Sequence, residues 1–248
     1  MRTAGIDIGS RTIELVILDG NDIIVNLQTD SGFDPMAQAS SLLKGMPYDR
    51  IMATGYGRHL FELSFDSPTV TEIKAYAVGA KRLLPETRSI LDIGGQDSKA
   101  IAINEDGRVS RFEMNDRCAA GTGKFLEIMA LTLGYELDTF GIEALKATGD
   151  ITINSLCTVF AESEVTSLLA RGAQRQDIAL GLHHSVVRRA AGMMKRVSIE
   201  EPILFAGGVA RNPCIRQLLE KALDRKITVP EGPQMVGALG AALLAMDK

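Results

Sequence analysis

Tryptophan is absent from the 248-residue chain, aromatic residues make up only 5% of it, and its three cysteines are Cys118, Cys157 and Cys214. An odd number of cysteines this far apart is not typical of a disulfide framework. We therefore expect reduced thiols that are free to bind metal or to do redox chemistry. The apolar segment of a secretory signal is also missing near the N-terminus. A cytoplasmic protein is the resulting expectation.

Long apolar runs and an excess of positive charge are missing as well. No run approaches the roughly 18 apolar residues of a membrane-spanning helix. The net charge is −4, the pI is near 5.5, and the 27 lysines and arginines are scattered. Nucleic-acid binders usually present a basic face and membrane-surface proteins a polybasic run, so neither kind of partner is expected. The composition, 46% hydrophobic and 23% charged, is that of a globular chain with one large domain or two small ones.

Two common nucleotide-binding motifs are absent, the P-loop G-x-x-x-x-G-K-S/T and the G-x-G-x-x-G that follows a strand. The chain instead repeats a short segment, since Ser89 to Asp97 echoes Gly5 to Thr12. Each copy reads as a buried strand, an Asp, a Gly turn and a second strand, followed by a hairpin turn at 19–22 or 104–107. An echo that also keeps the order of the elements indicates a duplicated half-domain.

Apolar spacing predicts the remaining elements. Further strands are expected at 23–27, 50–54, 203–206 and 227–229. Helices are expected at 35–43, 71–84, 123–133, 138–147, 159–169, 178–197, 212–223 and 235–246.

The two copies of the repeat suit phosphate binding. A buried strand delivers Asp7 or Asp92 to its end, and the following glycine lets the backbone turn close to a ligand. Amides in such a turn bind anions, and a carboxylate beside them suits Mg²⁺. Either loop alone is equally typical of an ordinary hairpin. A third loop, Gly207-Gly208 between a strand and a helix, suits an adenosine and makes the nucleotide interpretation the better one.

Longer motifs carry a resemblance to a known family. They are Asn-Asp-Arg-Cys-Ala-Ala-Gly-Thr-Gly from Asn115 and Leu-Cys-Thr-Val-Phe-Ala-Glu-Ser-Glu from Leu156. With the three loops, the chain resembles the actin, sugar kinase and Hsp70 ATPase superfamily. More narrowly, it resembles the ATP-dependent activators of 2-hydroxyacyl-CoA dehydratases, in the BadF/BadG/BcrA/BcrD ATPase family.

The resemblance implies an α/β fold of two duplicated actin-like (ribonuclease H-like) half-domains, with mixed sheets flanked by helices. Residues 1–86 with 232–248 would form the first, and residues 87–231 the second. It further implies an ATPase coupled to electron transfer, with Asp7 and Asp92 around Mg²⁺ and Gln96 and Asp97 near the attacking water. ATP or ADP would be bound by Gly9, Ser10, Arg11, Gly94, Gly95, Gly121, Thr122, Gly123, Glu127, Gly207, Gly208 and Gln234.

The cysteines then fall into two groups. Cys118 and Cys157 would give only two of the four thiolates that a 4Fe–4S cluster needs, and a two-fold homodimer would supply four. The resemblance implies one such cluster shared between two subunits. Their alternative is a pair of buried structural cysteines. Cys214 is interpreted as a packing residue, and the three histidines as surface or core residues without a metal role.

The implied partners are a second copy of the chain, a 2-hydroxyacyl-CoA dehydratase, and ferredoxin or flavodoxin as electron donor. Three alternatives stay open: an ATPase subunit of a benzoyl-CoA reductase, a small-molecule kinase of the same superfamily, and a regulatory ATPase-like module. The chain also departs from its relatives, which often carry Thr where it has Arg11 and Lys where it has Glu14. Many activators have Cys-His where it has Ala75-Tyr76.

Overall fold

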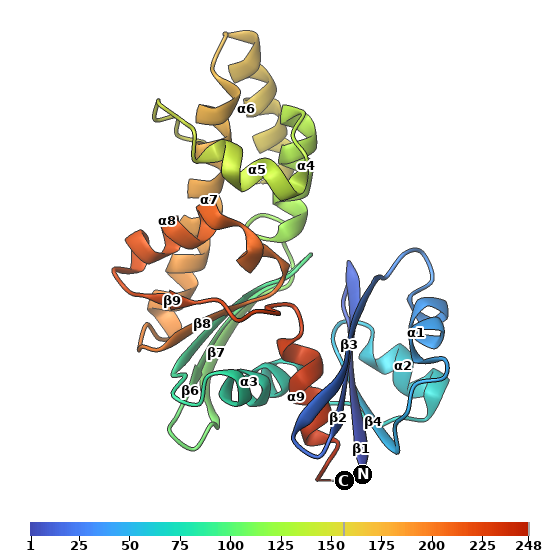
Figure 1. Cartoon of the computed structure of the whole chain (residues 1–248). Coiled ribbons are helices and arrows are strands. Elements are labelled where there is room, and N and C mark those ends of the chain that lie inside the picture. The colour runs from blue at the N-terminus through green and yellow to red at the C-terminus, as the bar shows by residue number, and fades with distance from the viewer. Residues whose placement is uncertain (156, 248) are drawn as a thin grey trace.

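The structure is a computed structural model that describes residues 1–155 and 157–247. Leu156 of the second cysteine motif and Lys248 of the predicted first half-domain lie outside the described residues. Two β-sheets, each flanked by helices, stand side by side, and a lobe of helices rises above the second sheet (Figure 1). The described helices include none long and apolar enough to cross a membrane.

The first sheet has four strands in the order β3-β2-β1-β4, of which β4 runs parallel to β1 and the others alternate in direction. They are β1 (Arg2–Ile8), β2 (Thr12–Asp19), β3 (Asp22–Asp30) and β4 (Arg50–Thr54). Helices α1 (Pro35–Leu43) and α2 (Arg58–Phe65) cover one face, and α9 (Val236–Leu244) covers the other.

The second sheet has five strands in the order β7-β6-β5-β8-β9. They are β5 (Ser89–Ile93), β6 (Ser98–Ile103), β7 (Val109–Asn115), β8 (Ile203–Ala206) and β9 (Ile227–Thr228). Strands β7, β6, β5 and β8 repeat the order and directions of β3, β2, β1 and β4. The predicted duplication is thereby confirmed. The domain bounds 1–86 with 232–248 and 87–231 stay a prediction.

The remaining helices surround the second sheet and build the lobe above it (Figure 1). They are α3 (Glu72–Leu83), α4 (Gly123–Leu133), α5 (Leu137–Ala144), α6 (Thr158–Ala170), α7 (Arg175–Val197), the 3₁₀ turn η1 (Gly208–Arg211) and α8 (Pro213–Leu223). The predicted helix 138–147 ends earlier, at Ala144, and helix α2 was not predicted. Helix α2 spans only eight residues, Phe61 is the one that is buried, and Gly57 gives it no side-chain cap, so it lacks the start signal of a longer helix.

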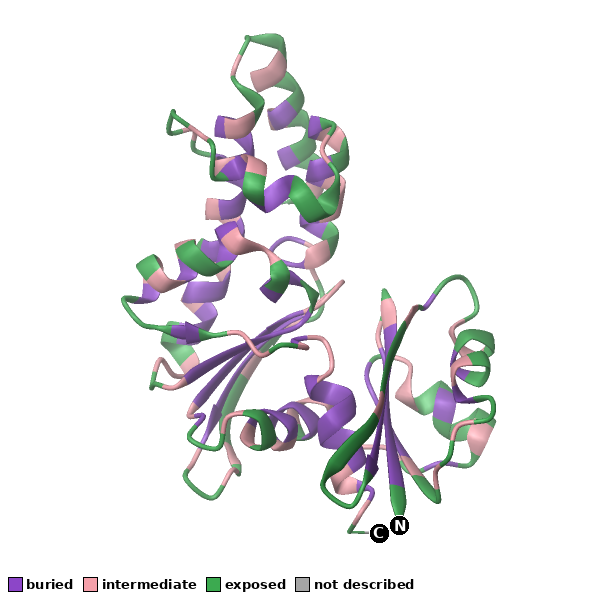
Figure 2. Cartoon of the chain, viewed as in Figure 1, coloured by how far each residue is buried: buried purple, intermediate pink, exposed green. Residues whose placement is uncertain are grey.

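Burial explains why the central strands read as continuous apolar runs. Helices cover both faces of each sheet, so β1 and β5 are buried along nearly their whole length, whereas the edge strand β3 is mostly exposed (Figure 2). In β5, Ile90 packs toward α3 while Leu91 and Ile93 pack toward α7. Asp7 and Asp92 thus lie near the ends of buried interior strands, which hold both carboxylates in place.

Candidate functional site

A cleft of about 880 Å³ lies between the two sheets, at the ends of strands β1, β5 and β8. Fourteen of the residues singled out from the sequence line it: Asp7, Gly9, Ser10, Arg11, Asp92, Gly94, Gly95, Gln96, Asp97, Gly123, Glu127, Gly207, Gly208 and Gln234. Gly121 and Thr122 do not line the cleft, and Thr122 is fully buried. The structure thus brings the three predicted loops to one place.

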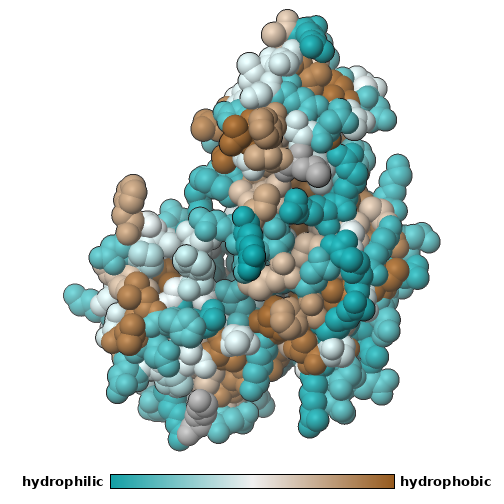
Figure 3. All heavy atoms as spheres, turned by 180° about the vertical axis from the view of Figure 1, so that it is seen from behind, coloured by the Kyte–Doolittle hydropathy of each residue, from teal (hydrophilic) through white to brown (hydrophobic). Residues whose placement is uncertain are grey.

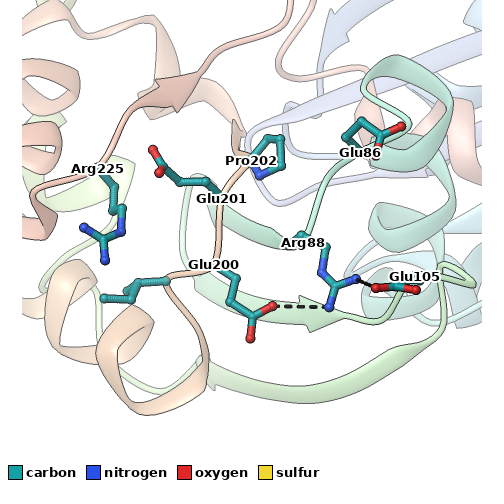
Figure 4. Close-up of a pocket in the computed structure, with 8 residues that line it drawn as sticks. Glu86, Arg88, Glu105, Glu200, Glu201, Pro202 and Arg225 are labelled. Atoms are coloured by element: carbon teal, nitrogen blue, oxygen red, sulfur yellow. Dashed lines mark hydrogen bonds and ion pairs between the residues drawn. The ribbon is translucent and has the colours of Figure 1, made fainter.

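A second depression, of about 760 Å³, opens on the far side of the second sheet. Figure 4 shows that Arg88 lies between two acidic side chains there, at 3.4 Å from Glu105 and 3.3 Å from Glu200. None of the residues predicted from the sequence lines it. We therefore place the functional site in the larger cleft.

The first two loops face each other closely. A Cβ atom added to Gly95 would lie 3.0 Å from Cβ of Arg11 and 3.1 Å from Oγ of Ser10. The second loop is closed by a hydrogen bond of 3.0 Å from the Gly94 amide to the Asp97 carbonyl. A side chain at position 95 would therefore force the first loop to shift, and glycine lets the two loops lie this close together.

The two carboxylates occupy equivalent positions in the duplicated sheets. Asp7 is the penultimate residue of β1 and lies against Gly55, and Asp92 is the penultimate residue of β5 and lies against Gly207. Both glycines have positive φ, +91° and +83°. A side chain at either glycine would come within 2.4 Å of an aspartate oxygen. These glycines therefore keep the space that each carboxylate fills.

The cross-strand partners of these aspartates differ. Asp92 stands opposite Lys99 in the β5–β6 ladder, whereas Asp7 stands opposite Glu14 in the β1–β2 ladder. The Nζ atom of Lys99 lies 3.0 Å from Asp92, 2.7 Å from Asp97 and 3.0 Å from Glu72. Sequence reasoning missed Lys99 and Glu72. The signal for Lys99 was there, because Lys99 follows Asp92 by the same seven residues that separate Glu14 from Asp7.

Burial shifts the ionisation of this group. It raises the pKa of Asp7 well above its ordinary value, and the charge of Glu14 adds to the effect. Burial also raises the pKa of Glu14 to about 7, against hydrogen bonds to Thr12 and Gln28. Burial raises the pKa of Asp92 to about 6, against the attraction of Lys99. The raised pKa values mean that the ammonium of Lys99 does not offset all of these carboxylates, so that protons or a cation must neutralise the rest.

Helix α4 is bonded to both phosphate loops. Its first amides donate to the second loop, Gly123 to the Gly94 carbonyl at 2.8 Å and Lys124 to the Gly95 carbonyl at 2.7 Å. One turn further on, Glu127 Oε1 lies 2.7 Å from Arg11 Nη1 of the first loop. The loop that carries Cys118 runs directly into this helix, so a single element connects that cysteine to both halves of the cleft.

The third loop is held by a buried histidine. Asn212 caps α8 by accepting a 3.1 Å bond from the Ile215 amide, and its Nδ2 donates to Nε2 of His183 at 2.9 Å. Nδ1 of His183 then donates to the Ala179 carbonyl at 2.7 Å, which identifies the neutral tautomer. Burial lowers the pKa of His183 to about 4. His183 is thus a core residue, as predicted, and it positions the loop that borders the cleft.

The three cysteines are free thiols in different surroundings. Cys118 is half-buried, and Cys157 is exposed at the N-cap of α6. Glu164 holds the segment that precedes Cys157, because its carboxylate accepts hydrogen bonds from the amides of Asn154 at 3.1 Å and Ser155 at 2.9 Å. Cys214 is fully buried in α8, where burial raises the pKa of its thiol to about 12.

Duplicated sheets, facing glycine loops and paired aspartates define an ATPase of the actin and sugar-kinase fold class. Over residues 4–245 the chain matches the model of the BadF/BadG/BcrA/BcrD ATPase family. It is 42% identical to the activator of lactoyl-CoA dehydratase of Anaerotignum propionicum, covering 100% of this chain and 98% of that relative. It is 31% identical to one of the subunits of the benzoyl-CoA reductase of Thauera aromatica, covering 97% of this chain and 92% of that relative.

A solved structure agrees with these relatives. The activator of the 2-hydroxyisocaproyl-CoA dehydratase from Clostridium difficile, with bound ADPNP, matches with a TM-score of 0.91 and 38% identity, covering 100% of this chain and 95% of that one. The chain belongs to the BadF/BadG/BcrA/BcrD ATPase family, as its motifs predicted.

Proposed function

We propose that the protein hydrolyses ATP to deliver a low-potential electron to a 2-hydroxyacyl-CoA dehydratase. One observation carries the proposal: the loop of Cys118 continues into α4, whose amides bond to the Gly94 and Gly95 carbonyls of the phosphate loop. A link this short suits a protein in which the state of a nucleotide controls a group held by cysteine. The similarity to the named activators, 42% and 38% identity, supports the same function.

In this proposal the nucleotide lies in the cleft with its phosphates between the first two loops. The amides of Gly9 and Gly95 and the hydroxyl of Ser10 would bind phosphate oxygens, and Gly207, Gly208 and Gln234 would border the adenosine. Mg²⁺ fits beside Asp92, because Oδ2 of Asp92 is bonded to Lys99 while its buried Oδ1 has no partner among the described residues. Asp7, on the opposite loop, would hold the same ion through water.

The attacking water belongs to the second loop in this proposal. Gln96 would orient it, and Asp97, which lies 2.7 Å from Lys99, would keep that ammonium beside the phosphates. Arg11 would meet the terminal phosphate from the first loop, since it stands against Gly95. Positioning and charge neutralisation of this kind account for most of the catalysis in phosphoryl transfer.

The cysteines fit half of a cluster site. Cys118 and Cys157 begin the segments that lead into α4 and α6, and no three described Cys, His, Asp or Glu side chains converge as a complete metal site. A second copy of the chain would add two thiolates, and the 4Fe–4S cluster then bound would supply one-electron transfer at low potential. Val159 and Phe160, next to Cys157 and 66% and 67% exposed, give the apolar surface that such a contact needs.

Apolar side chains also gather elsewhere on the helical lobe, which the space-filling view from behind shows in brown (Figure 3). This surface is available to the second copy and to the dehydratase. Reduced ferredoxin or flavodoxin, in the cytoplasm, is the proposed electron donor. The alternative of a reductase component has the lower identity, 31%, and would require an unlike partner chain.

The test is iron and acid-labile sulfide on protein purified without oxygen. We expect about four of each per homodimer, lost in Cys118→Ala and in Cys157→Ala and kept in Cys214→Ala, the buried control. ATP hydrolysis should remain measurable in all three variants, because none of the cysteines lines the cleft. A wild-type protein that hydrolyses ATP but contains no iron would reject the electron-transfer role.

A further inference from the structure

The two duplicated sheets differ at one equivalent position, where one has an acidic residue and the other a basic residue. Asp92 faces Lys99 across the β5–β6 ladder, and Asp7 faces Glu14 at the equivalent place in the β1–β2 ladder. Residues directly opposite in an antiparallel pair project from the same face of the sheet, so Glu14 points with Asp7 toward the cleft that both line. Like charges in such a pair are destabilising. The negative charge of Glu14 beside Asp7 must therefore be neutralised.

Among the described residues no free cationic side chain neutralises Glu14, and its hydrogen bonds to Thr12 and Gln28 come from neutral groups. Among the described residues, Lys99 is the one cation bonded to the acidic group at the cleft floor, and its Nζ is already shared by Glu72, Asp92 and Asp97. No ion pair to Asp7 or Glu14 occurs within the described part of the chain. The acidic side chains around this lysine are Asp7, Glu14, Glu72, Asp92 and Asp97.

Two oxygen atoms of the group are buried and have no hydrogen-bond partner in the described structure, Oε1 of Glu14 and Oδ1 of Asp92. The Glu14 side chain is only 4% exposed, and that of Asp92 is fully buried. A buried carboxylate oxygen without a hydrogen-bond partner is destabilising. Both residues line the cleft, so a small ligand that enters it reaches them.

The ligand that suits these atoms is a hard divalent cation. Carboxylate oxygens are the preferred ligands of Mg²⁺ and Mn²⁺, and Mg²⁺ is usually bound by one or two carboxylates while it keeps several waters. The described residues hold no cluster of three Asp, Glu, His or Cys side chains that would enclose an ion. Two carboxylates can bind an ion that keeps most of its water ligands, but they cannot enclose an ion that has lost them.

We propose that Asp7 and Glu14 bind a hydrated divalent cation without help from a nucleotide, at the place where the second half of the protein has the ammonium of Lys99. The cation is therefore bound before ATP enters the cleft. This inference rests on the proposed function for the position of the phosphates, but the cation site itself requires no nucleotide. It also gives a physical reason for a glutamate at a position where relatives often have a lysine.

The test is a titration of nucleotide-free protein with Mn²⁺, with free Mn²⁺ followed by electron paramagnetic resonance. We expect one ion per chain for the wild type. Glu14→Gln should weaken binding by about tenfold or more, because one charged ligand is lost, and Glu14→Lys should abolish it. Asp30→Asn is the matched control, since Asp30 is an exposed carboxylate that lines the same cleft from β3, and its binding should equal that of the wild type.

A second readout keeps the test independent of ATP hydrolysis. Mn²⁺ should raise the melting temperature of the wild type and of Asp30→Asn but not of Glu14→Lys. The folded state of Glu14→Lys is checked by its own melting transition in the absence of metal, where the relief of repulsion should leave it at least as stable as the wild type. Absence of Mn²⁺ binding by the nucleotide-free wild type would overturn the inference, as would wild-type affinity in Glu14→Lys. ATP hydrolysis measured on the same samples reports separately on the proposed function.

Discussion

Arg11 and Glu127 join the two halves of the protein across the mouth of the cleft, with 2.7 Å between Nη1 and Oε1, although they are 116 positions apart in the chain. Arg11 belongs to the first phosphate loop and Glu127 to α4, which the second phosphate loop already holds through Gly123 and Lys124. Phosphate oxygens entering the cleft would compete with Glu127 for the guanidinium, because both are anionic partners for arginine.

A double-mutant cycle of Arg11→Ala and Glu127→Gln tests this competition. In the absence of nucleotide the pair should contribute about 0.2–1 kcal/mol to the free energy of unfolding, since Arg11 is more than half exposed. With a non-hydrolysable ATP analogue bound, this coupling energy should vanish. Equal coupling with and without the analogue would show that Arg11 stays on Glu127. Lys195→Ala, an exposed change outside the cleft, is the control for general loss of charge.

Gly95→Ala should abolish nucleotide binding. The added methyl group would lie 3.0 Å from Cβ of Arg11 and 3.1 Å from Oγ of Ser10, so it would push the first loop away from the second and disturb the phosphate site between them. Isothermal titration with ADP measures the effect. Gly192→Ala is the matched control, because only the flexible end of Arg196 approaches that position; it should bind ADP normally and gain up to about 1 kcal/mol in stability. Unchanged affinity in Gly95→Ala would mean that the two loops separate when nucleotide binds.

Glu164→Gln should loosen the segment that carries Cys157. The carboxylate accepts from the Asn154 and Ser155 amides, and these bonds lower its pKa against the effect of burial. A neutral amide accepts more weakly, so iron should leave the variant several-fold faster in the presence of a chelator. Glu162→Gln, an exposed change on the same helix, is the control. Identical rates in both variants would contradict a positioning role for Glu164.

The buried imidazole of His183 predicts a loss of stability in acid. Its pKa is about 4 when folded and has an ordinary value of 6.5, so the unfolded chain binds the extra proton between these two pH values. Stability should therefore rise with pH across that window, by up to about 3 kcal/mol from this group. Urea unfolding at pH 4.5 and pH 8 measures it.

His183→Gln should flatten this pH dependence, whereas His184→Gln, a half-exposed neighbour on the same helix, should keep it. A His183→Gln profile that parallels the wild type would assign the acid sensitivity to other groups.

Much of the fold follows from local sequence signals. The strands that end in Asp7 and Asp92 are strongly apolar, and their glycine turns repeat, so both the duplication and the cleft could be predicted. Helix α2 could not, because it buries little more than Phe61. The same limit applies to the site. Loop residues were found by motif, while Lys99 and Glu72 were missed because their meaning depends on which strand and helix pack against Asp92. The ion pair of Arg11 with Glu127 is a tertiary contact that no local pattern encodes.

Different hydrogen bonds hold the segments that carry Cys118 and Cys157. Cys118 leads into α4, which the phosphate loop holds by main-chain hydrogen bonds, whereas the segment before Cys157 is anchored by Glu164 within α6 itself. A displacement of the phosphate loop would therefore reach Cys118 directly and Cys157 only through helix packing. The distance between the sulfur atoms of Cys118 and Cys157 would then depend on the nucleotide that is bound. A bifunctional thiol reagent of fixed length would turn that spacing into a measurable yield.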